Sequence, residues 1–266
     1  MPRIALGLEY DGSRYRGWQI QDHAPSVQDE LQKALSFVAA HPTAVVTAGR
    51  TDTGVHAAMQ VVHFDAPLDR GERSWVLGAN SRLPRDISAL WARPVPEHFH
   101  ARFGAQARSY RYLIQNRSSR PALMRERASW VREPLDADRM HIAAQQFCGT
   151  HDFSSFRAAE CQSRSPIRRL DSITVVRKGE YLAIDVTANA FLHHMVRNIA
   201  GVLIAIGRGL QPVEWVTTVL AARERRLGGV TAAPEGLFLV GVRYAPEFGL
   251  PSEPSIRECL AQRLPE

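Results

Sequence analysis

The order strand, helix, strand, strand occurs twice along this chain, once in each half, and this loose repeat constrains the fold more than any other feature. In the first half, alternating apolar side chains predict a strand over residues 4–10, and Ser26 then begins a helix as an N-cap. In the second half the pattern restarts at Asp136, which is suited to capping another helix. Such an order predicts a mixed α+β protein with its strands gathered into a sheet and its helices on one side.

Further elements follow from hydrophobic periodicity and from the turn residues between them. An arginine-rich stretch over residues 117–132 is predicted to be irregular, either a linker or a phosphate-facing loop. The proline-rich residues after Ala245 are predicted to form a surface tail with one short helix through Ile256, Leu260 and Leu264. The remaining predicted strands cover residues 43–48, 59–64, 87–95, 107–115, 170–176, 181–187 and 237–244, and the helices cover 27–38, 74–80, 136–147, 192–206 and a segment from 211.

The charge of the chain favours a polyanionic partner. Its net charge is +6, and Lys33 and Lys178 are the only lysines among 33 basic residues, so the other 31 are arginines. A GC-rich genome would also replace lysine by arginine throughout. It would not place arginines between aromatic residues, as residues 13–18 and 108–112 do. This interleaving favours single-stranded or splayed nucleic acid, whose bases stack and whose phosphates bind guanidinium groups.

Cysteine and histidine usage predicts neither a disulfide framework nor a metal site. The three cysteines are widely spaced and form no CxxC pair. His98 and His100 would share a strand face, and His193 is adjacent to His194, but neither pair has the carboxylate or cysteine partners of a known metal signature. We also expect a soluble, cytoplasmic protein without a membrane association, because the most apolar helical run, residues 198–207, is too short to span a bilayer.

Residues 49–57, with the sequence GRTDTGVHA, provide the first candidate for chemistry. They place Asp52 beside Arg50, between two threonines, and in a glycine-bounded turn between two predicted strands. A glycine-bounded turn lets the fold position an acid and lets a ligand approach closely. The alternative is an ordinary strand-loop-strand turn, since loops favour Gly, Thr and Asp in any case.

Arg197 and Tyr110 are the other candidates. Arg197 lies off the apolar stripe of its predicted helix, on a row with Gly201, where another element can approach closely. A guanidinium buried there needs an acid as its partner, and Asp52 is the candidate. The alternative is a solvent-facing arginine. Tyr110, between Arg108 and Arg111, is suited to stacking on a base, or else it packs on the core as an edge-strand aromatic.

A series of segments resembles the tRNA pseudouridine synthase A family, in order and through nearly the whole chain. Thr53 stands where close relatives are expected to have alanine, and the resemblance does not cover the tail after about Phe248. The segments are EYDGS at 9–13 with GWQ at 17–19, the 49–57 motif, FHAR at 99–102, YRY at 110–112, HDFSSF at 151–156, HHMVRNI at 193–199 and EGLFLV at 235–240.

The resemblance implies an isomerase that converts uridine to pseudouridine at positions 38, 39 and 40 in the anticodon arm of tRNA. In this family the N-glycosidic bond is broken, the uracil is rotated, and its C5 is joined to C1′ of the sugar. The resemblance implies that Asp52 is the required catalytic acid and that Arg197 is its ion-pair partner. It also implies that Tyr110 stacks on the target uracil and that Arg50 helps to hold the flipped nucleotide.

The family fold is implied as well. It consists of two similar α/β halves around a continuous, mainly antiparallel sheet with a central basic cleft. We therefore expect halves at residues 1–104, which carry Asp52, and 105–246, followed by a surface tail at 247–266. The resemblance further implies a homodimer that needs no cofactor and no metal.

Two other functions remain open from the residues themselves. One is a non-catalytic RNA-binding protein that chaperones tRNA with the same arginine-aromatic surface. The other is a hydrolase of the N-glycosidic bond, which would also need one acid and a flipped base. The residues also leave open whether Asp52 attacks the sugar, adds to the uracil or removes a sugar proton.

Overall fold

The computed structural model describes residues 1–68 and 70–251, and the chain forms two compact units. Unit one contains Met1–Gln106 and the described residues from Phe238 onward, and unit two contains residues 107–237. The predicted helix through Ile256, Leu260 and Leu264 lies outside the described residues.

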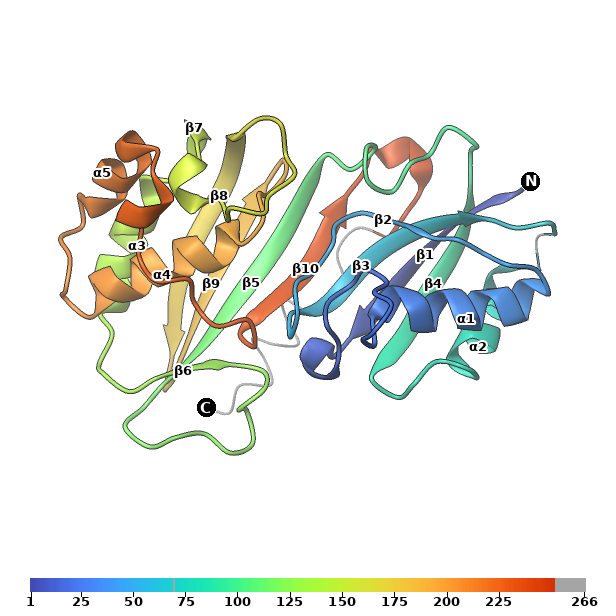
Figure 1. Ribbon diagram of the computed structural model, residues 1–266, viewed down its shortest axis with the longest axis horizontal. Coiled ribbons are helices and arrows are strands. Elements are labelled where there is room, and N and C mark those ends of the chain that lie inside the picture. Colours follow the sequence, from blue (N-terminus) through green and yellow to red (C-terminus); the bar gives the residue numbers. More distant parts are fainter. Residues whose placement is uncertain (69, 252–266) are drawn as a thin grey trace. The chain divides into compact units, whose positions relative to one another are not determined.

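Unit one is built on strands that pair in the order β4-β1-β3-β10 (Figure 1). β1 pairs antiparallel with both β3 and β4, whereas β10 pairs with β3 in parallel, through Phe238 opposite His56 and Leu239 opposite Ala57. A short strand, β2, also pairs with β3. The elements are β1 (Arg3–Tyr10), α1 (Val27–Ala39), β2 (Val46–Thr47), β3 (His56–Asp65), α2 (Glu72–Asn80), β4 (Ile87–Val95) and β10 (Leu237–Arg243).

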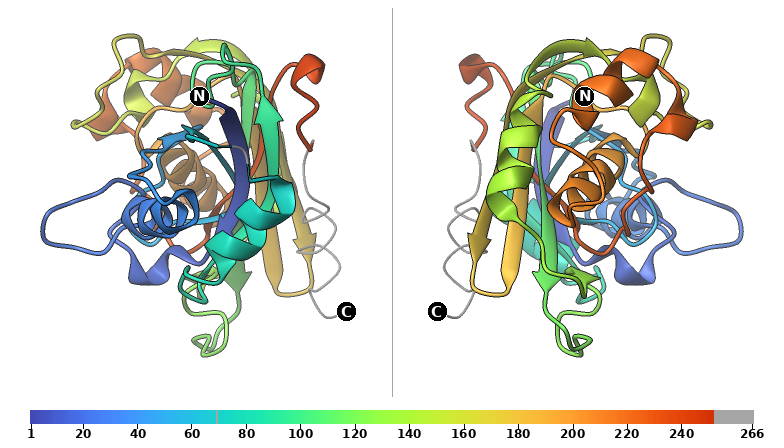
Figure 2. Two further views of the ribbon diagram at one scale, coloured as in Figure 1. Left: turned by 90° about the vertical axis from the view of Figure 1, so that its right-hand side faces the viewer. Right: turned by 90° about the vertical axis from the view of Figure 1, so that its left-hand side faces the viewer.

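The first helix forms where the sequence predicts it. Ser26 caps α1 by accepting a hydrogen bond from the backbone N–H of Asp29, 3.3 Å away. Val27, Leu31 and Leu35 recur at helical spacing and are fully buried, so this face of α1 packs into the core. Figure 2 shows α1 lying on one face of the unit-one strands.

Unit two contains a second antiparallel set of strands in the order β5-β9-β8-β7, with the short strand β6 parallel to β5. The predicted strand, helix, strand, strand of the second half correspond to β5, α3, β8 and β9, but the unpredicted strands β6 and β7 lie between them, so the second half does not follow the predicted order strictly. The elements are β5 (Ala107–Asn116), β6 (Ser129–Val131), α3 (Ala137–Gln145), β7 (Gly149–Asp152), β8 (Ile167–Lys178), β9 (Tyr181–Ala188), α4 (Met195–Gly207) and α5 (Trp215–Ala222).

The helix α4 is the most buried helix among the described residues of unit two. Nine of its residues are buried, including Val202 and Leu203, which are fully buried. It packs against β5 and α3, and Figure 2 shows it on one face of the unit-two strands. Asp136 caps α3, as predicted, by accepting a hydrogen bond from the N–H of Arg139 at 2.9 Å.

The mixed α+β class with mainly antiparallel pairing is confirmed, but several predicted elements differ in detail. The strand expected at 43–48 shrinks to Val46–Thr47, because side chains of α1 bind the preceding backbone: Ser36 Oγ accepts the N–H of Thr43, and Gln32 Oε1 accepts the N–H of Val45. The helix expected from residue 211 begins only at Trp215, and the arginine-rich stretch contains β6.

His98 and His100 do not share a strand face, because β4 ends at Val95 and a turn from Pro96 O to Phe99 N follows. Phe248, in the predicted tail, packs its ring 5.0 Å from that of Phe99.

The compact units divide the chain differently from the halves expected from the sequence. The first break falls between Gln106 and Ala107, and β10 groups with the N-terminal residues because it pairs with β3. The division into halves at residues 104 and 246 therefore remains a prediction. Among the described residues, no helix combines the length and apolar character needed to cross a bilayer.

Candidate functional site

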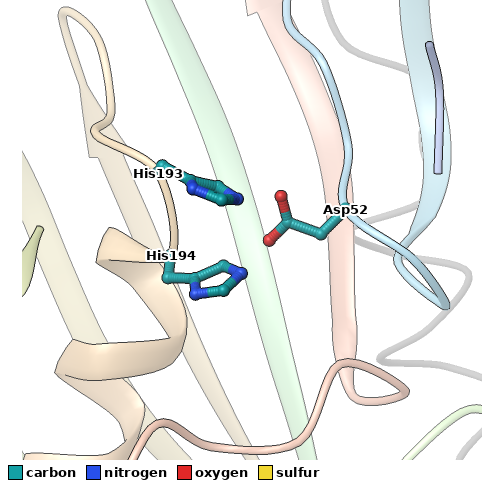
Figure 3. A group of neighbouring side chains, drawn as sticks. All are labelled: Asp52, His193 and His194. Atoms are coloured by element: carbon teal, nitrogen blue, oxygen red, sulfur yellow. The ribbon is translucent and has the colours of Figure 1, made fainter. Parts of the chain in front are cut away.

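Asp52 lies in the loop between β2 and β3 of unit one, where it is half-buried (Figure 3). Its neighbour Thr51 is buried, and Arg50 is exposed. The backbone turns immediately after the acid: the N–H of Val55 donates to the carbonyl of Asp52 at 3.1 Å, and Gly54 has a φ of 75°, a conformation that glycine adopts without strain. We call residues 49–55 the acid loop.

Residues 12–18, which follow β1, pack directly against the acid loop. The N–H of Trp18 donates to the carbonyl of Thr51 at 3.0 Å. A Cβ added at Gly17 would lie 2.8 Å from that same carbonyl oxygen, and one added at Gly12 would collide with the carbonyl of Val55. The glycines in the GS and GWQ segments are therefore explained by the close approach of the two backbones.

A buried set of polar side chains lies beside the acid loop. Tyr10 Oη is 2.8 Å from Thr51 Oγ1, and Gln60 Nε2 donates to the carbonyl of Gly49 at 2.6 Å and to Tyr10 Oη at 3.4 Å. Tyr10 is 4% exposed and Gln60 is fully buried. Burial raises the pKa of Tyr10 to about 12, so its hydroxyl stays protonated at neutral pH.

His56 anchors the far end of the acid loop at the start of β3. Its Nδ1 accepts the backbone N–H of Gly12 at 3.0 Å, and its ring stacks on Phe238 of β10 with centroids 4.6 Å apart. The acid loop is thus held at both ends by unit one.

Arg197 lies in the first turn of α4 in unit two and is half-buried; His193 and His194 directly precede this helix (Figure 3). Its side-chain Nε donates to the carbonyl of Ala232 at 2.8 Å, and its own carbonyl accepts the N–H of Ala232 at 3.1 Å. These two hydrogen bonds orient the guanidinium. The first turn of a helix already carries partial positive charge, so a cation there favours a negatively charged partner.

The segment that contacts Arg197, residues 225–232, forms a strap across α4. A Cβ added at Gly201 would collide with the carbonyl of Val230, which shows how closely the strap approaches. Asn198 Oδ1 accepts hydrogen bonds from Arg225 at 2.9 Å and from Thr231 at 2.7 Å. The close approach expected at Gly201 is therefore observed.

Tyr110 lies on β5 of unit two, opposite Val186 of β9. It is 9% exposed and packs edge-to-face on Phe191 at a centroid distance of 5.0 Å. Tyr112, on the same strand, is fully buried and its hydroxyl lies 2.6 Å from Ser129 Oγ, so it is a core residue.

The sequence candidates thus fall into two pairs, Arg50 with Asp52 in unit one and Tyr110 with Arg197 in unit two. Sequence reasoning missed Gln60 and Asn198. A usable signal existed for Gln60, because it is a polar residue within the apolar run of a predicted buried strand.

Within either unit taken alone, no three described His, Cys, Asp or Glu side chains lie close enough to hold a metal ion.

Comparison with known proteins identifies the family. The family model described as tRNA pseudouridine synthase matches residues 8–104 and 143–245. A protein named tRNA pseudouridine synthase A from Pseudomonas aeruginosa is 57% identical over 250 residues, covering 94% of this chain and 88% of that protein. Proteins of the same name from Aeromonas hydrophila and Coxiella burnetii are each 56% identical, covering 95% and 96% of this chain and 94% and 97% of their own lengths. The chain therefore belongs to the tRNA pseudouridine synthase A family, as its motifs predicted.

Proposed function

We propose that this isomerase converts uridine to pseudouridine at positions 38, 39 and 40 in the anticodon arm of tRNA, with Asp52 as its catalytic carboxylate. Family membership supplies the reaction and the substrate class. The observation that supports the role of Asp52 is the acid loop itself, which unit one holds by backbone contacts, by buried side chains and by the stack of His56 on Phe238. An ordinary surface turn would not need so many restraints.

The reaction requires a flipped nucleotide, because a stacked loop hides the glycosidic bond. We assign Arg50 to holding the flipped nucleotide, since it is exposed and next to Asp52 in sequence. Tyr110 is assigned to stacking on the uracil. Both assignments rest on the family resemblance, and the T-shaped contact with Phe191 gives the Tyr110 ring a fixed orientation for this role.

Arg197 is proposed as the ion-pair partner of Asp52. Its position in the first turn of α4 supports this role, because helix dipole and guanidinium together favour a carboxylate. The pairing would keep the carboxylate of Asp52 oriented while the uracil is released, rotated and rejoined through C5. In the last step the proton on C5 is lost to the solvent, and N1 of the uracil, which is no longer bonded to the sugar, takes up a proton.

tRNA is the proposed partner, in agreement with the net charge of +6. We further propose a cytoplasmic homodimer, which acts without a metal or cofactor. All three properties follow the family resemblance. Action without a metal or cofactor also agrees with the chemistry, because the isomerisation is redox-neutral and needs only an acid and a flipped base.

The test uses the purified protein and tRNA with tritium at C5 of its uridines, without any cofactor. Tritium release without free uracil supports the isomerase, whereas free uracil in the products would identify a hydrolase. Asp52→Asn should bind tRNA as the wild type does and lose about 10⁴-fold or more in rate, as catalytic residues do. Unchanged tritium release in Asp52→Asn would refute the role of Asp52.

A salt titration tests the RNA-binding part of the proposal. Phosphate contacts release counterions, so the affinity for tRNA should fall steeply between low and physiological salt. A flat salt dependence would contradict binding through the arginines.

A further inference from the structure

We propose that Tyr10 and Gln60 are positioning residues of the isomerase reaction: through Thr51 and Gly49 they fix the acid loop, and so set the orientation of Asp52 without touching the substrate. This inference rests on the proposed function of Asp52. It concerns residues of unit one alone.

The two side chains come from neighbouring strands and reach successive points of the loop. Tyr10 ends β1 and Gln60 lies within β3, and the two strands pair directly. Gln60 binds the carbonyl of Gly49, three residues before Asp52, while Tyr10 contacts the side chain of Thr51, one residue before it. The stretch that leads into Asp52 is therefore held at two separate points.

Burial makes the hydrogen bonds of Gln60 energetically important. Gln60 is the one residue of β3 that is neither apolar nor histidine between His56 and Phe64, and it is fully buried. Its amide is satisfied by Gly49 and Tyr10 on one side, and by the N–H of Val61 at 3.2 Å on the other. An apolar side chain would suit the core better, since a buried amide is costly unless all its hydrogen bonds are made. The loop contact accounts for a glutamine at this position.

The expected consequence is a loss of rate without a loss of binding. Tyr10→Phe removes only the hydroxyl, and Gln60→Met removes the amide while keeping the length of the side chain. A displacement of about 1 Å in a catalytic group can cost about 100-fold in rate. We expect single-turnover rates for tritium release to fall about 10- to 100-fold in both variants, with the dissociation constant for tRNA unchanged within about 2-fold.

The matched control is Tyr244→Phe. Tyr244 is also a buried tyrosine of unit one, and its hydroxyl donates to a backbone carbonyl, that of Ala101 at 2.7 Å. Its loss should lower stability about as much as the loss of the Tyr10 hydroxyl, yet leave the single-turnover rate within about 2-fold of wild type. A second comparison uses Thr51: Thr51→Ser keeps the hydroxyl and should recover most of the rate lost in Thr51→Val.

Outcomes separate this inference from the proposed function. If Asp52→Asn is inactive but Tyr10→Phe and Gln60→Met are folded and keep wild-type rates, the positioning role is wrong and the function stands. Equal losses of rate in Tyr244→Phe and Tyr10→Phe would also overturn it, because general destabilisation would then explain both. If Asp52→Asn is active, the proposed function itself fails.

Discussion

The acid loop of unit one and the first turn of α4 in unit two hold their key side chains by different means. Asp52 is in irregular backbone, and at least three separate contacts fix the residues around it: those of Trp18, Tyr10 and Gln60. Arg197 is on a helix, whose backbone is ordered already, and the strap needs only to orient its side chain through Ala232. The residues around Asp52 thus depend on contacts from several other segments, whereas the backbone of Arg197 is ordered by its own helix.

The comparison also explains the glycines. Gly12 and Gly17 let residues 12–18 approach the acid loop, and Gly201 lets the strap approach α4. In each region the absence of a side chain allows backbone groups to lie where they orient a neighbouring element.

Among the variants that test this comparison, the largest effect is expected from Arg197→Lys, on the helical side. Lysine keeps the charge but has no Nε to donate to Ala232 and no planar fork for a carboxylate. We expect about a 100-fold loss in single-turnover rate. Arg208→Lys at the end of the same helix is the control and should keep the wild-type rate. Full activity and stability in Arg197→Lys would rule out the proposed ion pair.

Next in size are Gly12→Ala and Gly201→Ala, one on each side of the comparison. Each places a methyl group far inside van der Waals contact with a backbone carbonyl, so each should destabilise by about 2 kcal/mol or more in urea unfolding. Gly78→Ala is the control, because the atoms nearest to its new methyl belong to the side chain of Val38 and not to backbone, so a side-chain shift can relieve the contact, and alanine favours the helix. A change below about 0.5 kcal/mol in both test variants would show that the two approaches are not tight.

A smaller effect is expected from Thr231→Val, which removes a hydroxyl from the strap. The lost hydrogen bonds to Asn198 and Arg225 should cost about 1 kcal/mol of stability. If the strap acts by orienting Arg197, Thr231→Val should lower the rate a few-fold in the wild-type background. In the Arg197→Lys background it should barely change the rate, because the contact with Ala232 is already lost. Strictly additive rate losses in the double variant would separate the strap from Arg197.

The smallest effect is a difference in acid sensitivity between the two units. Burial lowers the pKa of His63 on β3 to about 4, and its Nδ1 accepts the N–H of Ala101. The folded state therefore binds a proton on His63 less well than the unfolded state does. The resulting contribution of His63 to stability is fully present above pH 6.5 and is lost as the pH falls toward 4.

Between pH 7.5 and 6 the free energy of unfolding should fall by about 1 kcal/mol because of His63. Amide hydrogen exchange should show unit one opening more readily over this range, and His63→Gln should reduce the change. If unit two responds first, or if His63→Gln leaves the pH dependence unaltered, His63 is not the group responsible.

Sequence-based prediction was reliable where interactions over a few residues decide the structure. The caps Ser26 and Asp136 and the strand over Ile87–Val95 were predicted correctly, because side-chain caps and periodicity act over a few residues. The strand at 43–48 failed because the competing partners, Ser36 and Gln32, are on a helix that the local pattern does not connect to it.

The candidate residues were found by their motifs, but their supports were not. Gly12 and Gly17 are explained only once the approaching backbone is known, and nothing near Asn198 in sequence identifies Arg225 or Thr231 as its partners. Pairings between residues far apart in the chain depend on tertiary packing, which periodicity does not encode.

The parallel pairing of β10 with β3 has a consequence for biosynthesis. A chain emerging from the ribosome presents β3 and the acid loop early, yet the strand on which His56 stacks through Phe238 is made after all of unit two. Until that point β3 has an unpaired edge at its start, beside the acid loop. A prematurely terminated product thus contains Asp52 but lacks the strand that completes its support, so translation must proceed past residue 240 before an active enzyme can form.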